Sequence, residues 1–258
     1  MKIGIVGLGF VGGTVERWFA AMGGVELYRY DKYKNVGSIE SVNRADVIFV
    51  AVPTPYGPKG YDASAVQETL KNLRPGKIVV IKSTILPLST KMFQDYYPDL
   101  TVLFNPEFLT EANAYGDFLN PTRQLVGYAS EDGKRAAERV LALLPPSPYS
   151  RVLPSTEAEL VKYFSNTFLS TRVIFANQMY DICRRVGANY GAVREAAAVD
   201  PRIGASHFDV FDGGYRGYGG HCLPKDTRAL IQFARNLGVP VKLLETLEEV
   251  NSSLNQQG

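Results

Sequence analysis

The sequence opens with Lys2-Ile-Gly-Ile-Val-Gly-Leu-Gly-Phe-Val-Gly12, a short apolar strand pattern that runs directly into the glycine motif G-x-G-x-x-G. A helical pattern follows the motif, and a second predicted strand runs from Val25 to Tyr30 and ends at Asp31. A strand before the motif, a helix after it and an acid about 20 residues further on are the context of a dinucleotide-binding fold. The stretch therefore predicts a Rossmann-type unit at the start of the chain.

Each part of this motif has an expected role in holding a dinucleotide. The first glycine makes the tight turn, the second lets the pyrophosphate approach the backbone at the helix N-terminus, and the third allows the helix to pack on the strand. Asp31 would accept hydrogen bonds from the ribose hydroxyls, which favours NAD over NADP because a 2′-phosphate would meet a like charge. Lys32 and Lys34 lie close by and weaken that preference.

Predicted strands and helices alternate from Met1 to about Pro154, which is typical of an α/β fold with a doubly wound parallel sheet. Ligands of such sheets bind off the carboxyl ends of the strands. Several polar side chains follow predicted strands at those ends, namely Ser83, Thr84, Asn105, Glu107 and Glu111.

The second part of the chain is predicted to be all-helical. A long helix is expected from Ser155 to Val186, followed by helices over 189–198, 225–236 and 241–254. We therefore expect a Rossmann-type NAD-binding domain over 1–153 and a central helical domain over 154–258.

A glycine-rich segment, Gly217-Tyr-Gly-Gly-His-Cys-Leu-Pro-Lys-Asp226, places a cysteine, a lysine and an aspartate within five residues. Pro224 suits the first position of a helix, so Cys222 would lie just ahead of a helix N-terminus. The helix dipole and Lys225 would favour the thiolate there, as a nucleophile requires. A buried structural cysteine fits the segment as well, and the segment by itself does not decide between them.

Composition narrows the class of protein. The chain has 258 residues and a formal net charge of +2, which does not indicate a nucleic-acid partner and is compatible with an anionic substrate. Two cysteines do not make a disulfide framework, so a reducing cytoplasm is expected. We expect no signal peptide, no membrane span and no metal site.

Six motifs together resemble the UDP-glucose/GDP-mannose 6-dehydrogenase family in order and spacing: GLGFVG, VPTP, KST, NPEFLTEA, AELVKYFSN and GYGGHCLPKD. The resemblance implies NAD-dependent, four-electron oxidation of the C6 alcohol of a nucleotide sugar, UDP-glucose foremost, to the uronic acid. The intermediates would be a thiohemiacetal and a thioester on Cys222. Family members continue into a further UDP-binding domain, so we expect a short form that binds nucleotide sugars weakly alone. A separate nucleotide-binding polypeptide is one source of the missing contacts.

The resemblance also implies the roles of particular residues. Lys162 and Asn166 would face the reacting carbon, Thr84 and Asp226 would hold a water that acts as base, and Glu107 would assist thioester hydrolysis. The implied cofactor-binding residues are Gly7, Gly9, Phe10, Val11, Gly12, Asp31, Lys32, Val52, Pro53, Thr54, Thr84, Glu111 and Lys225. The implied substrate-binding residues are Phe108, Leu109, Lys162, Asn166, Arg202 and Gly219.

Some alternatives stay open. Arg202 resembles a family arginine that reaches the substrate of the neighbouring subunit, which implies a homodimer built on the long helix; an ordinary surface arginine also fits.

His221 stands where glucose-type and mannose-type relatives more often carry serine, and it points to N-acetylamino sugars. Pro224-Lys-Asp226 instead favours the glucose-type and mannose-type relatives. A silent NAD-binding regulatory paralogue, or a two-electron β-hydroxyacid dehydrogenase, would share the same two-domain plan.

Overall fold

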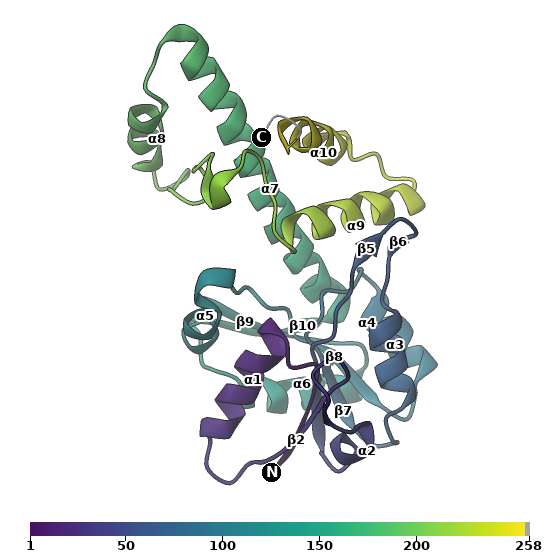
Figure 1. Cartoon of the computed structure of the whole chain (residues 1–258). Helices are drawn as coiled ribbons and strands as arrows, with labels where there is room; N and C mark the ends of the chain where they lie inside the picture. The colour runs from purple at the N-terminus through teal and green to yellow at the C-terminus, as the bar shows by residue number, and fades with distance from the viewer. Residues whose placement is uncertain (256–258) are drawn as a thin grey trace. The chain divides into compact units, whose positions relative to one another are not determined.

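The computed structural model describes residues 1–255, apart from the side chain of Glu111. It divides into two compact units, Met1–Lys162 and a second unit that begins at Tyr163 (Figure 1). Helix α7 (Ser155–Val186) begins in the first unit and continues into the second, and its bounds are those predicted from the sequence.

The first unit is built on an eight-stranded sheet of order β10-β9-β8-β7-β4-β1-β2-β3. Neighbouring strands pair in parallel from β8 through β7, β4 and β1 to β2, as the sequence predicts. Because the strand order reverses beside β1, a crevice is expected at the carboxyl ends of β1 and β4. The strands are β1 (Lys2–Val6), β2 (Glu26–Asp31), β3 (Val36–Gly37), β4 (Val47–Val50), β7 (Ile78–Ile81), β8 (Thr101–Phe104), β9 (Arg123–Tyr128) and β10 (Tyr149–Pro154).

Helices cover both faces of this sheet, as strand β4 illustrates. Val47 and Phe49 pack in one core cluster with side chains from α1 and α6, and Ile48 and Val50 pack in the other with side chains from α3 and α4. Alternate residues of a strand point to opposite faces, so both faces must be apolar when helices cover both. The helices are α1 (Phe10–Ala21), α2 (Ile39–Val42), α3 (Ser64–Lys71), α4 (Ser89–Tyr96), α5 (Ala114–Leu119) and α6 (Glu131–Leu143).

The sheet is mainly parallel, as predicted, but β9 runs antiparallel to β8, and the two-residue β3 runs antiparallel to β2. A parallel pair needs a crossover that returns the chain to the far end of the sheet. Between β8 and β9 the chain forms only a loop, the 3-10 turn Glu111–Asn113 and the six-residue α5. This segment stays at the carboxyl end of β8, so Arg123 starts β9 beside the loop that carries Glu107.

The second unit is helical, as predicted. It contains most of α7, then α8 (Tyr190–Ala198), the 3-10 turn Asp212–Gly214, α9 (Leu223–Asn236) and α10 (Lys242–Asn255). One core cluster joins Val173 and Ile174 of α7 to Tyr218 and to Leu247 of α10. The backbone N–H of Tyr218 donates to Asn251 Oδ1 at 2.7 Å, which fixes the glycine-rich segment to α10 ahead of Cys222.

Within residues 1–255, no helix has both the length and the apolar character that crossing a membrane requires. The same part of the chain holds no cluster of histidine, cysteine, aspartate and glutamate side chains that would bind a metal ion.

Candidate active site

The glycine motif forms an open turn between β1 and α1. Gly7 has φ +84°, and a Cβ there would lie 2.4 Å from the carbonyl oxygen of Ala51. A Cβ at Gly12 would lie 1.8 Å from the carbonyl oxygen of Gly7, so only glycine allows α1 to pack this closely. A Cβ at Gly9, the residue that precedes α1, would meet nothing within 4 Å. The helix N-terminus therefore faces open space, as pyrophosphate binding requires.

Beside this turn lies a cavity of about 390 Å³. Asp31 is buried in its wall, where Oδ2 accepts from Leu8 N at 2.7 Å and Oδ1 accepts from Tyr33 N and Lys34 N, each at 2.9 Å. Burial acts to raise the pKa of Asp31, but these backbone donors outweigh it and hold the pKa below its ordinary value. Of the predicted cofactor-binding residues, the cavity is lined by Gly7, Gly9, Asp31, Lys32, Val52 and Pro53.

Side-chain hydrogen bonds join the loops after β4 and β7, which carry the predicted cofactor-binding residues Thr54 and Thr84. Thr54 Oγ1 donates to the carbonyl oxygen of Thr84 at 2.8 Å, and the Tyr61 hydroxyl donates to the same oxygen at 3.0 Å. Ser83 Oγ donates to the carbonyl oxygen of Val52 at 2.7 Å. The backbone of Thr84 is thus fixed, while its side-chain hydroxyl takes no part in these bonds.

A buried ion pair joins the loop after β8 to α7. Lys162 Nζ lies 2.6 Å from Glu107 Oε1 and also donates to the Glu107 carbonyl oxygen at 2.9 Å. The exposed fractions of the Lys162 and Glu107 side chains are 4% and 10%. Lys162 is therefore buried, although lysine side chains usually lie at the surface. Burial acts to raise the pKa of Glu107, but Lys162, Leu109 N and Lys82 together lower it, so the carboxylate is ionised.

A second buried lysine, which the sequence reasoning missed, lies at the end of β7. Lys82 Nζ donates to Asn105 Oδ1 at 2.6 Å, and Asn105 Nδ2 donates to Gln124 Oε1 at 3.1 Å. Burial lowers the pKa of Lys82 to about 8, although the charge of Glu107 opposes this. Its sequence signals were its place in the KST motif and its position directly after four apolar residues of a buried strand.

The phenyl ring of Phe108 lies beside these charges. The guanidinium of Arg123 lies 3.8 Å from the ring centroid, and Lys162 Nζ lies 5.9 Å from it. Both distances are within the range of cation–π contacts. The predicted substrate residues Phe108 and Leu109 are therefore held next to the Glu107–Lys162 pair.

A second group of predicted residues comes together in the second unit. Asn166 Nδ2 donates to Asp226 Oδ2 at 2.6 Å, and Lys225 Nζ lies 2.6 Å from Asp226 Oδ1. Asp226 has no exposed surface, so both contacts offset the cost of its burial. Cys222 immediately precedes α9, as predicted, and Asp226 follows it by one helical turn. Cys222 is exposed, whereas the other cysteine, Cys183, is buried.

Other predicted residues stand apart from these groups. Arg202 pairs with Asp200 at 2.6 Å, and its side chain is 88% exposed. Phe10 is also exposed and begins α1, followed by Val11. At Gly219 a Cβ would come within 2.3 Å of the hydroxyl of the exposed Tyr215, so a larger residue there would require this tyrosine side chain to move. The side chain of Glu111 lies outside the described part of the chain.

A further carboxylate with an altered pKa, that of Glu159, was not among the predicted site residues. Glu159, in the first turns of α7, accepts from Leu88 N at 2.7 Å and from Thr90 N at 2.8 Å. It therefore binds the backbone N–H groups at the start of α4. Burial raises the pKa of Glu159 to about 7, although these hydrogen bonds act to lower it.

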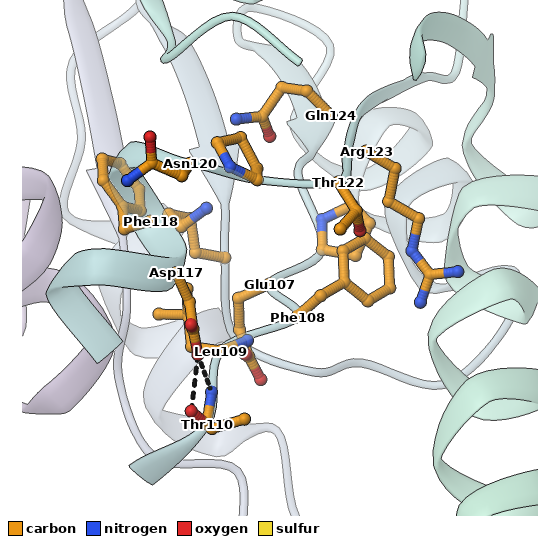
Figure 2. A pocket seen from close by; sticks show the side chains of 13 residues that line it. Glu107, Phe108, Leu109, Thr110, Asp117, Phe118, Asn120, Thr122, Arg123 and Gln124 are labelled. Carbon is orange, nitrogen blue, oxygen red and sulfur yellow. Dashed lines mark hydrogen bonds between the residues drawn. The ribbon is translucent and has the colours of Figure 1, made fainter. Parts of the chain in front are cut away.

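A second cavity of the first unit, of about 200 Å³, lies between the loop after β8 and the start of β9. Figure 2 shows its two walls: the loop with Glu107, Phe108 and Leu109 forms one, and the chain from Phe118 to Gln124 forms the other.

A Rossmann-type unit with an open glycine turn at the start of α1 defines the class of dinucleotide-binding proteins. Two family models match the chain. The UDP-glucose/GDP-mannose dehydrogenase family's NAD binding domain matches residues 26–144, and the central domain of the same family matches residues 156–253. The chain belongs to this family, and its first unit is the family's NAD-binding domain.

Relatives agree with this assignment. The UDP-glucose 6-dehydrogenase of Rhizobium meliloti is 37% identical over 231 residues, which are 83% of this chain and 51% of the relative. The UDP-glucose 6-dehydrogenase AglM of Haloferax volcanii is 29% identical over 97% of this chain and 69% of its own length. This chain therefore spans about half the length of the first relative.

Solved structures match the fold. A UDP-glucose dehydrogenase from Pyrobaculum islandicum superposes with a TM-score of 0.85 at 29% identity, covering 98% of this chain and 68% of that protein. The 3-hydroxyisobutyrate dehydrogenase of Mycobacterium tuberculosis superposes with a TM-score of 0.75 at 16% identity, covering 98% of this chain and 92% of that protein. The second match shows the shared fold alone.

Proposed function

We propose that the chain oxidises the C6 alcohol of a nucleotide sugar, with UDP-glucose as the first candidate, to the uronic acid. One alcohol, two NAD and one water give one carboxylate, two NADH and three protons. The names of the relatives and the family of the NAD-binding domain support this substrate class.

The first oxidation is assigned to Lys162 and Thr84 of the first unit. The C6 hydroxyl loses its proton to a water held by Thr84, and the C6 hydride passes to NAD. Lys162 stabilises the alkoxide that forms before the hydride leaves. The burial of Lys162 supports this role, since a charge shielded from solvent acts more strongly on its neighbours.

The second oxidation is assigned to Cys222. Its thiolate adds to the aldehyde carbon to give a thiohemiacetal, and loss of a second hydride to NAD gives a thioester. Covalent capture keeps the reactive aldehyde from leaving between the two steps. The observation that carries the proposal is an exposed cysteine at the N-terminus of α9, one turn before the buried Asp226.

Replacing the cysteine tests this assignment. Cys222→Ser should bind NAD normally and stall after the first hydride, because only the second oxidation needs the sulfur nucleophile. The matched control is Cys183→Ala, which changes the buried cysteine of the same unit and should still release two NADH per UDP-glucose. Two NADH from Cys222→Ser at an unchanged rate would remove Cys222 from the mechanism.

We also propose that the chain forms a homodimer through α7. Phe164, Phe168, Phe175, Ile182 and Val186 follow one another at spacings of 4, 7, 7 and 4 residues, so they share one face of the helix. All five are more than half exposed. A contiguous apolar face of this kind is typical of an interface between subunits.

A further inference from the structure

The backbone that leads to Cys222 in the second unit is rich in glycine and largely exposed. Gly217 and Gly220 have φ values of +83° and +70°, in the left-handed region that favours glycine. Glycine has more backbone freedom than any other residue and loses more entropy when it is ordered. Over the described residues 211–222, Tyr218 alone is buried. The position of Cys222 therefore depends on how Tyr218 is held.

The side chain of Asn251, on α10, holds the backbone of Tyr218 through two hydrogen bonds. Tyr218 N donates to Asn251 Oδ1 at 2.7 Å, and Asn251 Nδ2 donates to the Tyr218 carbonyl oxygen at 3.0 Å. A side-chain amide offers the acceptor and the donor that this pairing needs, whereas a carboxylate offers only acceptors. Because both polar groups of one residue are bound, the backbone of Tyr218 is fixed in orientation as well as in place.

Asn251 is a polar residue on the apolar face of its helix. Leu247, Asn251 and Leu254 are spaced i, i+4 and i+7, so they share one face of α10, and all three are buried. A buried amide destabilises the folded state unless its hydrogen bonds are satisfied. Tyr218 satisfies them here, so Asn251 favours the arrangement of the glycine-rich segment in which Tyr218 lies at this position.

A second residue of α10, Glu248, binds the chain on both sides of Cys222. Its Oε2 accepts from the Tyr218 hydroxyl at 2.9 Å. Burial and the Glu248 charge raise the pKa of Tyr218, so this hydroxyl keeps its proton and is the donor. Glu248 Oε1 lies 2.5 Å from Arg228 Nε of α9, the helix that lies beside α10 (Figure 1). One carboxylate thus joins the segment before Cys222 to the helix after it.

The helix that follows Cys222 is fixed independently, by α7. Asp226 N donates to the Cys222 carbonyl oxygen at 2.9 Å, and Asp226 Oδ2 accepts from Asn166 Nδ2 at 2.6 Å. In the next position, Thr227 Oγ1 lies 3.0 Å from Ser170 Oγ. Cys222 therefore stands between two fixed points, one four residues earlier at Tyr218 and one four residues later at Asp226.

We propose that Asn251 and Glu248 are positioning residues for the nucleophile: through Tyr218 they hold the segment that sets the place of Cys222. The proposal rests on the proposed function. Neither residue touches the reacting atoms. Their effect is to remove conformations of the glycine-rich segment in which the sulfur is displaced, and a displacement of about 1 Å is enough to slow a reaction severely. Because only the second oxidation uses the sulfur, their loss should slow the second hydride transfer and spare the first.

The test removes the two hydrogen bonds at similar side-chain volume, in Asn251→Leu. In stopped-flow measurements at saturating UDP-glucose and NAD, the first NADH should form at the wild-type rate and the second at least about tenfold more slowly. Cys183→Ser is the matched control, because it places a hydroxyl at a buried site of the same unit and lowers stability without changing Tyr218. It should leave both rates unchanged. Tyr218→Phe removes only the bond to Glu248 and should slow the second NADH to a smaller extent, also if Asn251→Leu does not fold.

Hydrogen exchange tests the same contacts without turnover. The backbone amide of Tyr218 should exchange at least about tenfold faster in Asn251→Leu than in the wild type, whereas the amides of α9 should keep their rates.

Three results would overturn the proposal. One is an unchanged exchange rate at Tyr218 in Asn251→Leu, because the segment would then be held by other contacts. Another is faster exchange with an unchanged second NADH, which would mean that order in the segment does not serve Cys222. The third is equal slowing of both NADH, or the same split in Cys183→Ser, which would indicate a general loss of structure. Absence of NADH from the wild-type chain would instead contradict the proposed function, while the exchange experiment would still test how Tyr218 is held.

Discussion

The carboxylate of Asp31 is buried in the wall of the cofactor cavity. Three backbone N–H groups hold it in place and keep it ionised, and it lines the cavity directly. Each of the two nearby lysines already contacts another group of the protein. Lys32 is largely exposed and lies 3.7 Å from Glu68, and Lys34 Nζ donates to the Leu8 carbonyl oxygen at 2.6 Å.

We therefore expect NAD to bind at least about tenfold more tightly than NADP, because the 2′-phosphate would approach a fixed negative charge. Calorimetric titration of both cofactors measures the ratio. Lys32→Ala and Lys34→Ala are the matched variants, and neither should reverse the order. Tighter binding of NADP, lost in one of these variants, would mean that a lysine rather than Asp31 sets the preference.

At this scale, the sequence predicted the types of site residue better than their environments. The positions of Asp31 and Cys222 follow from local motifs, and both lie where those motifs place them. The burial of Lys162 and Lys82 does not follow from any local pattern, since a lysine in a sequence is usually exposed. Burial depends on which loops meet around a side chain, and that is decided by the tertiary fold.

Among the elements, the first turns of α7 hold two loops of the Rossmann-type unit. Lys162 binds the loop after β8 through Glu107, and Glu159 binds the start of α4 through Leu88 and Thr90. Leu88 has φ +75° and offers no capping side chain, so Glu159 serves as a cap from a distant part of the sequence.

Because Glu159 caps α4 while buried, the free energy of unfolding should depend on pH in an unusual direction. The pKa of Glu159 is about 7 in the folded protein, above the ordinary value of 4.5, so the folded state binds more protons between these pH values. The free energy of unfolding should therefore fall as pH rises from about 4.5 to 7, by at most about 3 kcal/mol from this group. Glu159→Gln should remove that component and add a pH-independent loss of about 1–3 kcal/mol from an unsatisfied N–H group.

Urea unfolding at several pH values between 4.5 and 7 measures the effect. Glu138→Gln, which changes an exposed carboxylate of α6, is the control and should keep the wild-type pH dependence. An identical pH dependence in wild type and Glu159→Gln would show that this carboxylate is not the source.

Element types and bounds were largely predictable, whereas strand direction was not. The capping residues at the start of α7 and the apolar spacing along it predicted Ser155–Val186 correctly. The apolar run of β9 predicted a strand, but a period of two residues is the same in either direction. Only the short connection through α5 makes β9 antiparallel to β8, and that connection forms one wall of the cavity between the loop after β8 and the start of β9.

For the molecule as a whole, the exposed face of α7 predicts the oligomeric state. Phe164 and Phe168 lie near its start, with ring centroids 6.5 Å apart, and are 75% and 53% exposed. Changing both to serine should convert the dimer to monomer, raising the dissociation constant at least about a hundredfold, because large apolar anchors dominate such interfaces.

Sedimentation velocity over a range of concentrations measures this change. Leu243→Ser alters a residue of α10 that is 64% exposed and should leave the dimer intact. A wild-type chain that is monomeric at high micromolar concentration would refute the proposed interface.

The central claim is that one chain removes four electrons from one sugar carbon. The most direct measurement is the amount of NADH formed per molecule of UDP-glucose consumed, with NAD in excess and the product identified by mass. Two NADH and a uronic acid are predicted. One NADH per substrate, with the product left at the aldehyde, would contradict the account, and so would NAD binding with no NADH from any nucleotide sugar.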